Sequence, residues 1–183
     1  MQRPFVDRPV LDLDSAGLLA VEASAHWGLA APVLLRAGMN AIYRAGDVVL
    51  RVSAPSAPAV ASIELAETLL GRGLAVTRPV RADVVEAAGL SATAWEHLPG
   101  TGAPIDWRSV GRLVRRTHAI ESSELPGAYP LPRPSDFPWW NFSALLDEVA
   151  DVLDDRARGG IQEAIDRWPD WDDPDGSVVC HGD

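Results

Sequence analysis

Short apolar runs separated by turn signals dominate the first half of the chain, and this pattern is typical of an antiparallel sheet. Glycine in the spacers, as in Gly46-Asp47 and at Gly89, favours tight turns between neighbouring strands. The pattern therefore predicts a sheet of five short strands, which lie at residues 32–36, 41–45, 48–52, 84–87 and 91–95.

Apolar residues recur at spacings of three and four in five other segments, which predict helices. The first, with Asp14 or Ser15 as its cap and Gly28 as its stop, precedes the sheet. The second interrupts the strands, and the other three follow them. We expect these helices at residues 14–27, 58–71, 106–120, 142–157 and 161–168.

Residues 98–102, Leu-Pro-Gly-Thr-Gly, separate the sheet segment from the later helices. A sheet followed by helices is an α+β arrangement. We therefore expect an N-terminal lobe over residues 1–100, with one large helix inserted in its sheet, and the first part of a helical lobe over residues 101–183. An apolar run at residues 178–180 predicts one further strand.

The charge excludes some partners. The formal net charge of the 183 residues is -10, and residues 106–183 contain 8 arginines against 16 acidic residues. Nucleic acid would be repelled by such a surface, because its affinity comes from clustered cations. No apolar run is long enough for a membrane span, and no secretory signal precedes residue 14, so a cytoplasmic protein is expected. The acidic half suits a cationic small molecule.

Arg51 is the first candidate for chemistry. It stands in Val48-Val49-Leu50-Arg51-Val52, a run that is otherwise apolar. A cation in a buried strand requires an anion, either a carboxylate or a phosphate. An arginine on an edge strand that points to solvent is the structural alternative. The chain contains no lysine, so Arg51 also has no lysine competitor for this role.

Other candidate groups lie before and after Arg51 in the sequence. Glu64 and Glu67, on the next predicted helix, can each supply a carboxylate. The turn that contains Gly38 and Asn40 can bring backbone N–H groups to a phosphate. Near residue 183, His181 and Asp183 follow an apolar strand, where an aspartate can accept a proton or bind a metal ion.

Taken together, six segments in consistent order resemble the aminoglycoside phosphotransferase and choline kinase-like family, which has a protein-kinase-like fold. They include a G-x-x-N nucleotide loop, a strand with arginine in place of the kinase lysine, a hinge, and the H-G-D that opens a catalytic loop. These segments lie at residues 38–44, 49–52, 73–79, 95–100, 111–118 and 178–183.

The resemblance implies ATP as the nucleotide, Mg²⁺ as the metal ion and the hydroxyl of a small molecule as the phosphoryl acceptor. Gly38 and Asn40 would belong to the nucleotide loop. Arg51 would contact the α- and β-phosphates and pair with a helix glutamate. Register against residues 73–79 favours Glu64 for this pair, while helical periodicity favours Glu67.

The resemblance also assigns the adenine contacts and the catalytic loop. The backbone of Trp95, Glu96 and His97 would hydrogen-bond the adenine. Asp183 would be the catalytic base, and His181 would orient its loop.

The family pattern continues beyond H-G-D to an asparagine and an aspartate that hold the metal ion. Neither follows Asp183 in this sequence, so we expect a fragment or a chain that is inactive by itself. The alternative is a non-catalytic remnant that only binds nucleotide or a partner. A metal-dependent hydrolase that uses His181 and Asp183 is a third hypothesis, but the other histidines form no ligand cluster with them in the sequence.

Overall fold

The computed structural model describes residues 8–167 except 56, 101, 128 and 130–140, and the expected strand at 178–180 lies outside these residues. It divides into two compact units. The described part of the first unit lies within residues 8–129, and that of the second within residues 141–167. The expected boundary at residue 100 thus falls inside the first unit, because the first helix after the sheet belongs to the same unit as the sheet.

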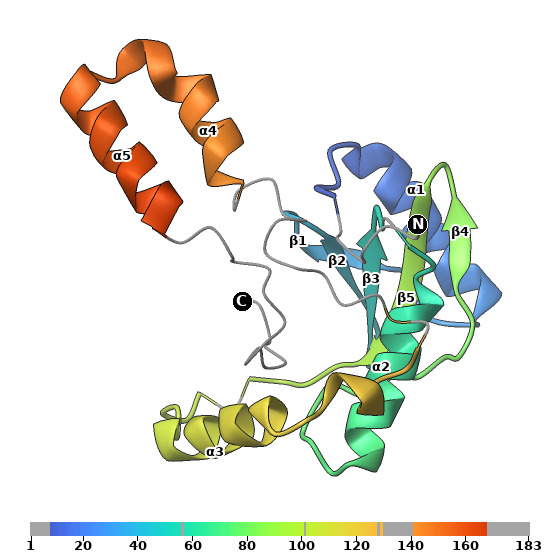
Figure 1. Ribbon diagram of the computed structural model, residues 1–183. Coiled ribbons are helices and arrows are strands. Elements are labelled where there is room, and N and C mark those ends of the chain that lie inside the picture. Colours follow the sequence, from blue (N-terminus) through green and yellow to red (C-terminus); the bar gives the residue numbers. More distant parts are fainter. Residues whose placement is uncertain (1–7, 56, 101, 128, 130–140, 168–183) are drawn as a thin grey trace. The chain divides into compact units, whose positions relative to one another are not determined.

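The first unit contains the predicted five-stranded antiparallel sheet (Figure 1). The spatial order β1-β2-β3-β5-β4 places β3 at the centre, with β2 and β5 as its neighbours. Arg51 therefore lies on the central strand, and the alternative of an edge-strand arginine is wrong. The strands are β1 (Val33–Arg36), β2 (Ala41–Ala45), β3 (Val48–Ser53), β4 (Val85–Ala87) and β5 (Leu90–Glu96).

Helix α1 (Leu13–His26) covers one face of the sheet and forms the main core with it. Leu50 and Val52 from β3 point to this face and are fully buried. Their burial removes apolar surface from water and is the main source of stability here. The remaining members of this core come from α1, from every strand except β1 and from the segments that flank them; they include Leu19, Ala41, Tyr43, Val85, Ala92 and Ala94.

The start of α1 differs from the prediction. The cap of α1 is Asp12, whose side chain accepts a hydrogen bond of 3.0 Å from the Ser15 backbone N–H; Asp14 and Ser15 are not the cap. Gly28 ends the helix as expected, with φ +65°.

The second unit is a helical hairpin of α4 (Phe142–Val149), a 3₁₀ turn (Ala150–Val152) and α5 (Asp155–Arg167). The single helix expected over residues 142–157 is wrong. Leu153 is extended, with ψ 141°, and the Asp154 carboxylate accepts the Ala157 N–H at 2.7 Å, so a new helix begins there. Gly159 and Gly160 lie inside α5 rather than between two helices.

The other two helices belong to the first unit. They are α2 (Val60–Gly71), which interrupts the strands, and α3 (Trp107–His118), which Asp106 caps. No helix among the described residues is long and apolar enough to cross a membrane.

Candidate functional site

The candidate site lies on the face of the sheet opposite α1. Side chains alternate between the two faces along a strand, so Arg51 points away from Leu50 and Val52. Its cross-strand neighbours on that face are Ile42 on β2 and Thr93 on β5. Arg51 is half-buried and Thr93 is buried.

The strand register extends this row to a second arginine. Arg36 on β1 pairs with Ile42, so the row across the sheet reads Arg36, Ile42, Arg51, Thr93. Neighbouring strands are about 4.8 Å apart, which places the two arginine backbones about 10 Å from each other. A ligand on this face would therefore meet two cations on either side of an apolar residue.

A bulge in β1 produces this arrangement. Leu34 pairs with Tyr43, which points to the α1 face, and simple alternation would put Arg36 on that face as well. The register shifts between Leu34 and Arg36, and the extra residue turns Arg36 to the opposite face. Sequence reasoning missed Arg36, because a bulge leaves no clear mark in a four-residue strand.

The next row on the same face reads Val33, Arg44, Val49 and Trp95. Arg44 donates from Nε to the Gly46 carbonyl oxygen at 2.9 Å, so this row has a cation beside its apolar and aromatic side chains. The indole Nε1–H of Trp95 donates to Thr93 Oγ1 at 2.8 Å, and the Thr93 hydroxyl donates to the Arg51 carbonyl oxygen at 3.5 Å. These bonds hold the indole alongside Thr93, so an aromatic surface lies beside the arginine row.

The expected hinge lies at the Val48 end of β3, opposite the end where the 38–40 turn lies, since Val48 pairs with Glu96 and Val52 with Ala41. Two of its backbone donors have protein acceptors. The Glu96 N–H donates to the Arg78 carbonyl at 2.9 Å and the His97 N–H to the Asp47 carbonyl at 3.2 Å. The next backbone donor along the chain belongs to Leu98.

The turn at residues 37–40 lies at the other end of the sheet. Gly38 is exposed, and a Cβ built on it meets nothing within 4 Å. A larger side chain there would intrude on the space beside the turn rather than on the protein. Asn40, immediately before β2, is half-buried.

The two candidate glutamates on α2 differ in exposure. Glu64 is half-buried and Glu67 is exposed, while Ile63 and Ala66 form the buried side of the helix. Of the helical stripe that favoured Glu67, namely residues 60, 63, 67 and 70, only Ile63 is buried, and Glu67 itself is exposed. Of the two carboxylates, Glu64 is the one held in reduced contact with solvent.

The expected catalytic loop residues His181 and Asp183 lie outside the described residues. Across the part of the chain that is described, no group of three His, Cys, Asp or Glu residues is arranged to hold a metal ion.

The comparisons with known proteins add no relative: no family model, no curated protein and no solved structure matches this chain.

Proposed function

We propose that this chain belongs to the aminoglycoside phosphotransferase and choline kinase-like family, and that it binds ATP on the Arg51 face of the sheet. The observation that carries the proposal is the pair of rows on that face. Arg36 and Arg51 lie in one row, and Val49 and Trp95 lie side by side in the next, where Arg44 is the β2 neighbour of Val49. The first pair can bind a phosphate chain, and the second pair can contact a flat, apolar base.

The direction of the nucleotide follows from the strand register. Val49 and Trp95 are nearer the hinge, so the adenine lies there. Arg51 is three residues from Val48, about 10 Å along the strand, and so the phosphates lie towards the 38–40 turn. Guanidinium groups bind phosphate oxygens with charge-assisted, often bidentate hydrogen bonds.

The adenine contact differs in detail from what the sequence resemblance suggests. Because the Glu96 and His97 N–H groups already have protein acceptors, the adenine would be recognised by the Glu96 carbonyl and the Leu98 N–H. Trp95 would contribute its indole face.

The reaction proposed for this family, which the chain is not expected to complete by itself, is transfer of the γ-phosphoryl group of ATP to the hydroxyl of a small molecule. The hydroxyl oxygen attacks the γ-phosphorus, the bond to the bridging β–γ oxygen breaks, and ADP leaves. Asp183 accepts the hydroxyl proton, as the resemblance implies. An amino-alcohol or aminoglycoside acceptor would suit the negative charge of residues 106–183.

Calorimetry with ATP and with adenosine tests the binding site. We expect Arg51→Ala and Arg36→Ala each to weaken ATP binding about tenfold, since hydrogen bonds to charged groups contribute about 1.5–3 kcal/mol. Adenosine lacks phosphates, so its affinity should change little. The control is Arg158→Ala, which removes an exposed arginine of α5.

Equal losses for ATP and adenosine would place the arginines outside the phosphate site. No ATP binding by the unaltered chain would overturn the proposal as a whole. ADP release in the presence of alcohols, lost in Asp183→Asn, separates a phosphotransferase from a remnant that only binds nucleotide.

A further inference from the structure

A second, smaller core joins α2 to the segment that follows α3. Leu74, Ile120 and Leu125 are buried in it, and Leu65 and Leu69 of α2 pack against them. The core on the α1 side of the sheet, in contrast, contains no α2 residue. The C-terminal half of α2 is therefore anchored on this second core.

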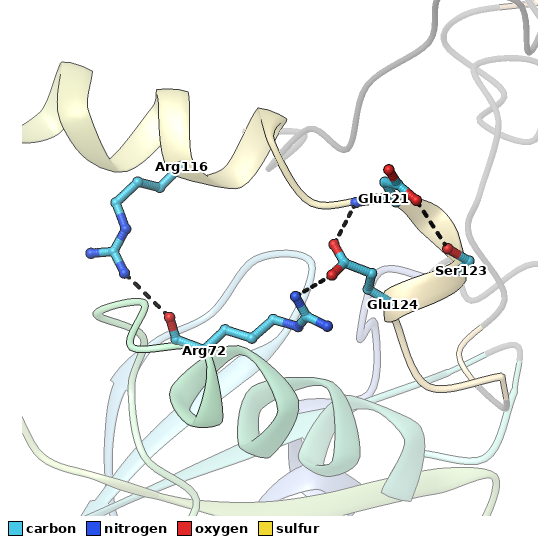
Figure 2. A network of polar contacts seen from close by, with 5 residues as sticks. All are labelled: Arg72, Arg116, Glu121, Ser123 and Glu124. Atoms are coloured by element: carbon cyan, nitrogen blue, oxygen red, sulfur yellow. Dashed lines mark hydrogen bonds and ion pairs between the residues drawn. The ribbon is translucent and has the colours of Figure 1, made fainter.

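Three charged residues reinforce this contact, and we call Arg72, Arg116 and Glu124 the clamp (Figure 2). Arg116, near the end of α3, donates from Nη2 to the Gly73 carbonyl at 2.8 Å and to the Arg72 carbonyl at 3.3 Å. These carbonyls follow the last turn of α2. A cation is favoured there by the negative end of the helix dipole.

The Arg72 side chain completes the clamp in the other direction. Its guanidinium forms an ion pair with the Glu124 carboxylate, in the 3₁₀ turn Ser122–Glu124. The other carboxylate oxygen, Glu124 Oε2, accepts the Glu121 backbone N–H at 2.9 Å. Both carboxylate oxygens of Glu124 are thus engaged, and its direction is fixed by the turn that carries it.

The turn that follows α2 at Gly73 has a constrained backbone conformation. Gly73 has φ +70°, and a Cβ on it would lie 3.4 Å from Arg116 Nη2. A Cβ there would be in ordinary van der Waals contact with the arginine, so it is the left-handed backbone that favours glycine.

We propose that the clamp positions α2 and thereby sets the nucleotide affinity of the sheet face; Arg72 and Glu124 are positioning residues. This inference rests on the proposed function. Arg72 lies eight residues after Glu64, about 12 Å along the helix axis. Glu64 is half-buried and is the carboxylate that the resemblance pairs with Arg51. Because α2 is a rigid element held at its C-terminal end, a change at that end shifts Glu64 relative to the Arg51 face and so changes nucleotide affinity.

The test is a double-mutant cycle in the full chain with Arg72→Ala, Glu124→Gln and the pair of substitutions together. ATP affinity is measured by calorimetry and α2 mobility by hydrogen exchange of the amides at residues 60–71. We expect each single variant to bind ATP about three- to tenfold more weakly and to exchange faster in α2. The double variant should bind ATP no more weakly than the single variant with the lower affinity, because both substitutions remove the same interaction.

The matched control is Glu163→Gln, which removes an exposed ion pair with Arg167 within α5. It should change neither readout. Circular dichroism at the binding temperature establishes that each variant is folded.

The possible outcomes separate the two proposals. Unchanged α2 exchange in both single variants would overturn the inference, and so would faster exchange with unaltered ATP affinity. If the unaltered chain bound no ATP, the proposed function would fail and the nucleotide part of the inference with it. Hydrogen exchange would then decide by itself whether the clamp holds α2.

Discussion

The half-buried Arg51 on the central strand can be recognised from the sequence, because a single cation in an apolar run is rare. Arg36 cannot, although it lies in the same row across the sheet. Its side chain reaches this face through a bulge, and bulges depend on how two strands pair rather than on the residues of one strand. Only one of the two arginines of the candidate phosphate site can therefore be recognised from the sequence.

Asp83 fastens the loop before β4 to the end of α1. Its Oδ2 accepts the Trp27 indole N–H at 3.0 Å and lies 2.9 Å from His26 Nε2. The Trp27 bond, followed by the His26 bond, lowers the pKa of the Asp83 carboxyl below its ordinary value. Asp83 thus binds protons less readily in the folded state than in the unfolded state.

This lowered pKa predicts a pH dependence of stability. The contribution of Asp83 is fully present above its ordinary pKa and is lost as the pH falls from about 4 through the folded-state pKa. Asp83→Asn should therefore be less stable than the unaltered protein at pH 7, and the difference should narrow at pH 3. Thermal unfolding at both pH values measures it, and a constant difference would contradict the assignment.

Leu50 lies at the centre of the core between α1 and the sheet, with no exposed surface. Leu50→Ala should lower the free energy of unfolding by about 2–5 kcal/mol, because it loses buried apolar surface and leaves a cavity. Urea denaturation measures the change.

Leu18 on α1 provides the control for Leu50, since 73% of its surface is exposed. Leu18→Ala should change stability by about 0.5 kcal/mol or less. Similar losses in the two variants would mean that the core lies elsewhere.

At the scale of elements, the apolar pattern placed every strand of the sheet within about two residues of its observed position. The helix ends were less predictable. Asp12, Asp14 and Ser15 are all good capping residues, and the choice among them depends on which backbone leaves the extended conformation. Asp12 is the last residue before the helix that is still extended, with φ -95° and ψ 92°.

The cap assignment is tested by comparing two aspartates. Asp12→Ala should destabilise the protein by about 1 kcal/mol, because the Ser15 N–H loses its acceptor. Asp14→Ala removes only a favourable charge in the first turn and should cost about 0.3 kcal/mol. Urea denaturation separates the two, and a larger loss in Asp14→Ala would reverse the assignment.

The break between α4 and α5 illustrates the limit of periodicity. Apolar residues continue at helical spacing from α4 into residues 152–157, so a single helix was expected. Two local features favour a break instead. Leu153 has an extended backbone, and the Asp154 carboxylate accepts a hydrogen bond from the Ala157 N–H. Glycines 159 and 160 are accommodated inside α5 despite their low helix propensity.

At the scale of the whole molecule, the formal net charge of -10 predicts that the protein does not bind nucleic acid. A labelled DNA duplex should show no binding in fluorescence anisotropy at 0.15 M salt, because the net negative charge opposes the phosphate backbone and outweighs the arginines of α3. Binding that weakened steeply with added salt would contradict this expectation.

The sequence by itself determined the elements and their order, because alternation, helical spacing and turn residues act over a few neighbouring positions. It also pointed to Arg51, to either Glu64 or Glu67, and to the hinge as candidate site residues. Only the tertiary structure decided that β3 is central, that Arg36 joins Arg51 on one face and that Glu64 is less exposed than Glu67. It also decided that Arg72 meets Glu124, 52 residues away. Strand register and contacts between distant segments depend on the packing of the whole unit, and no local pattern encodes them.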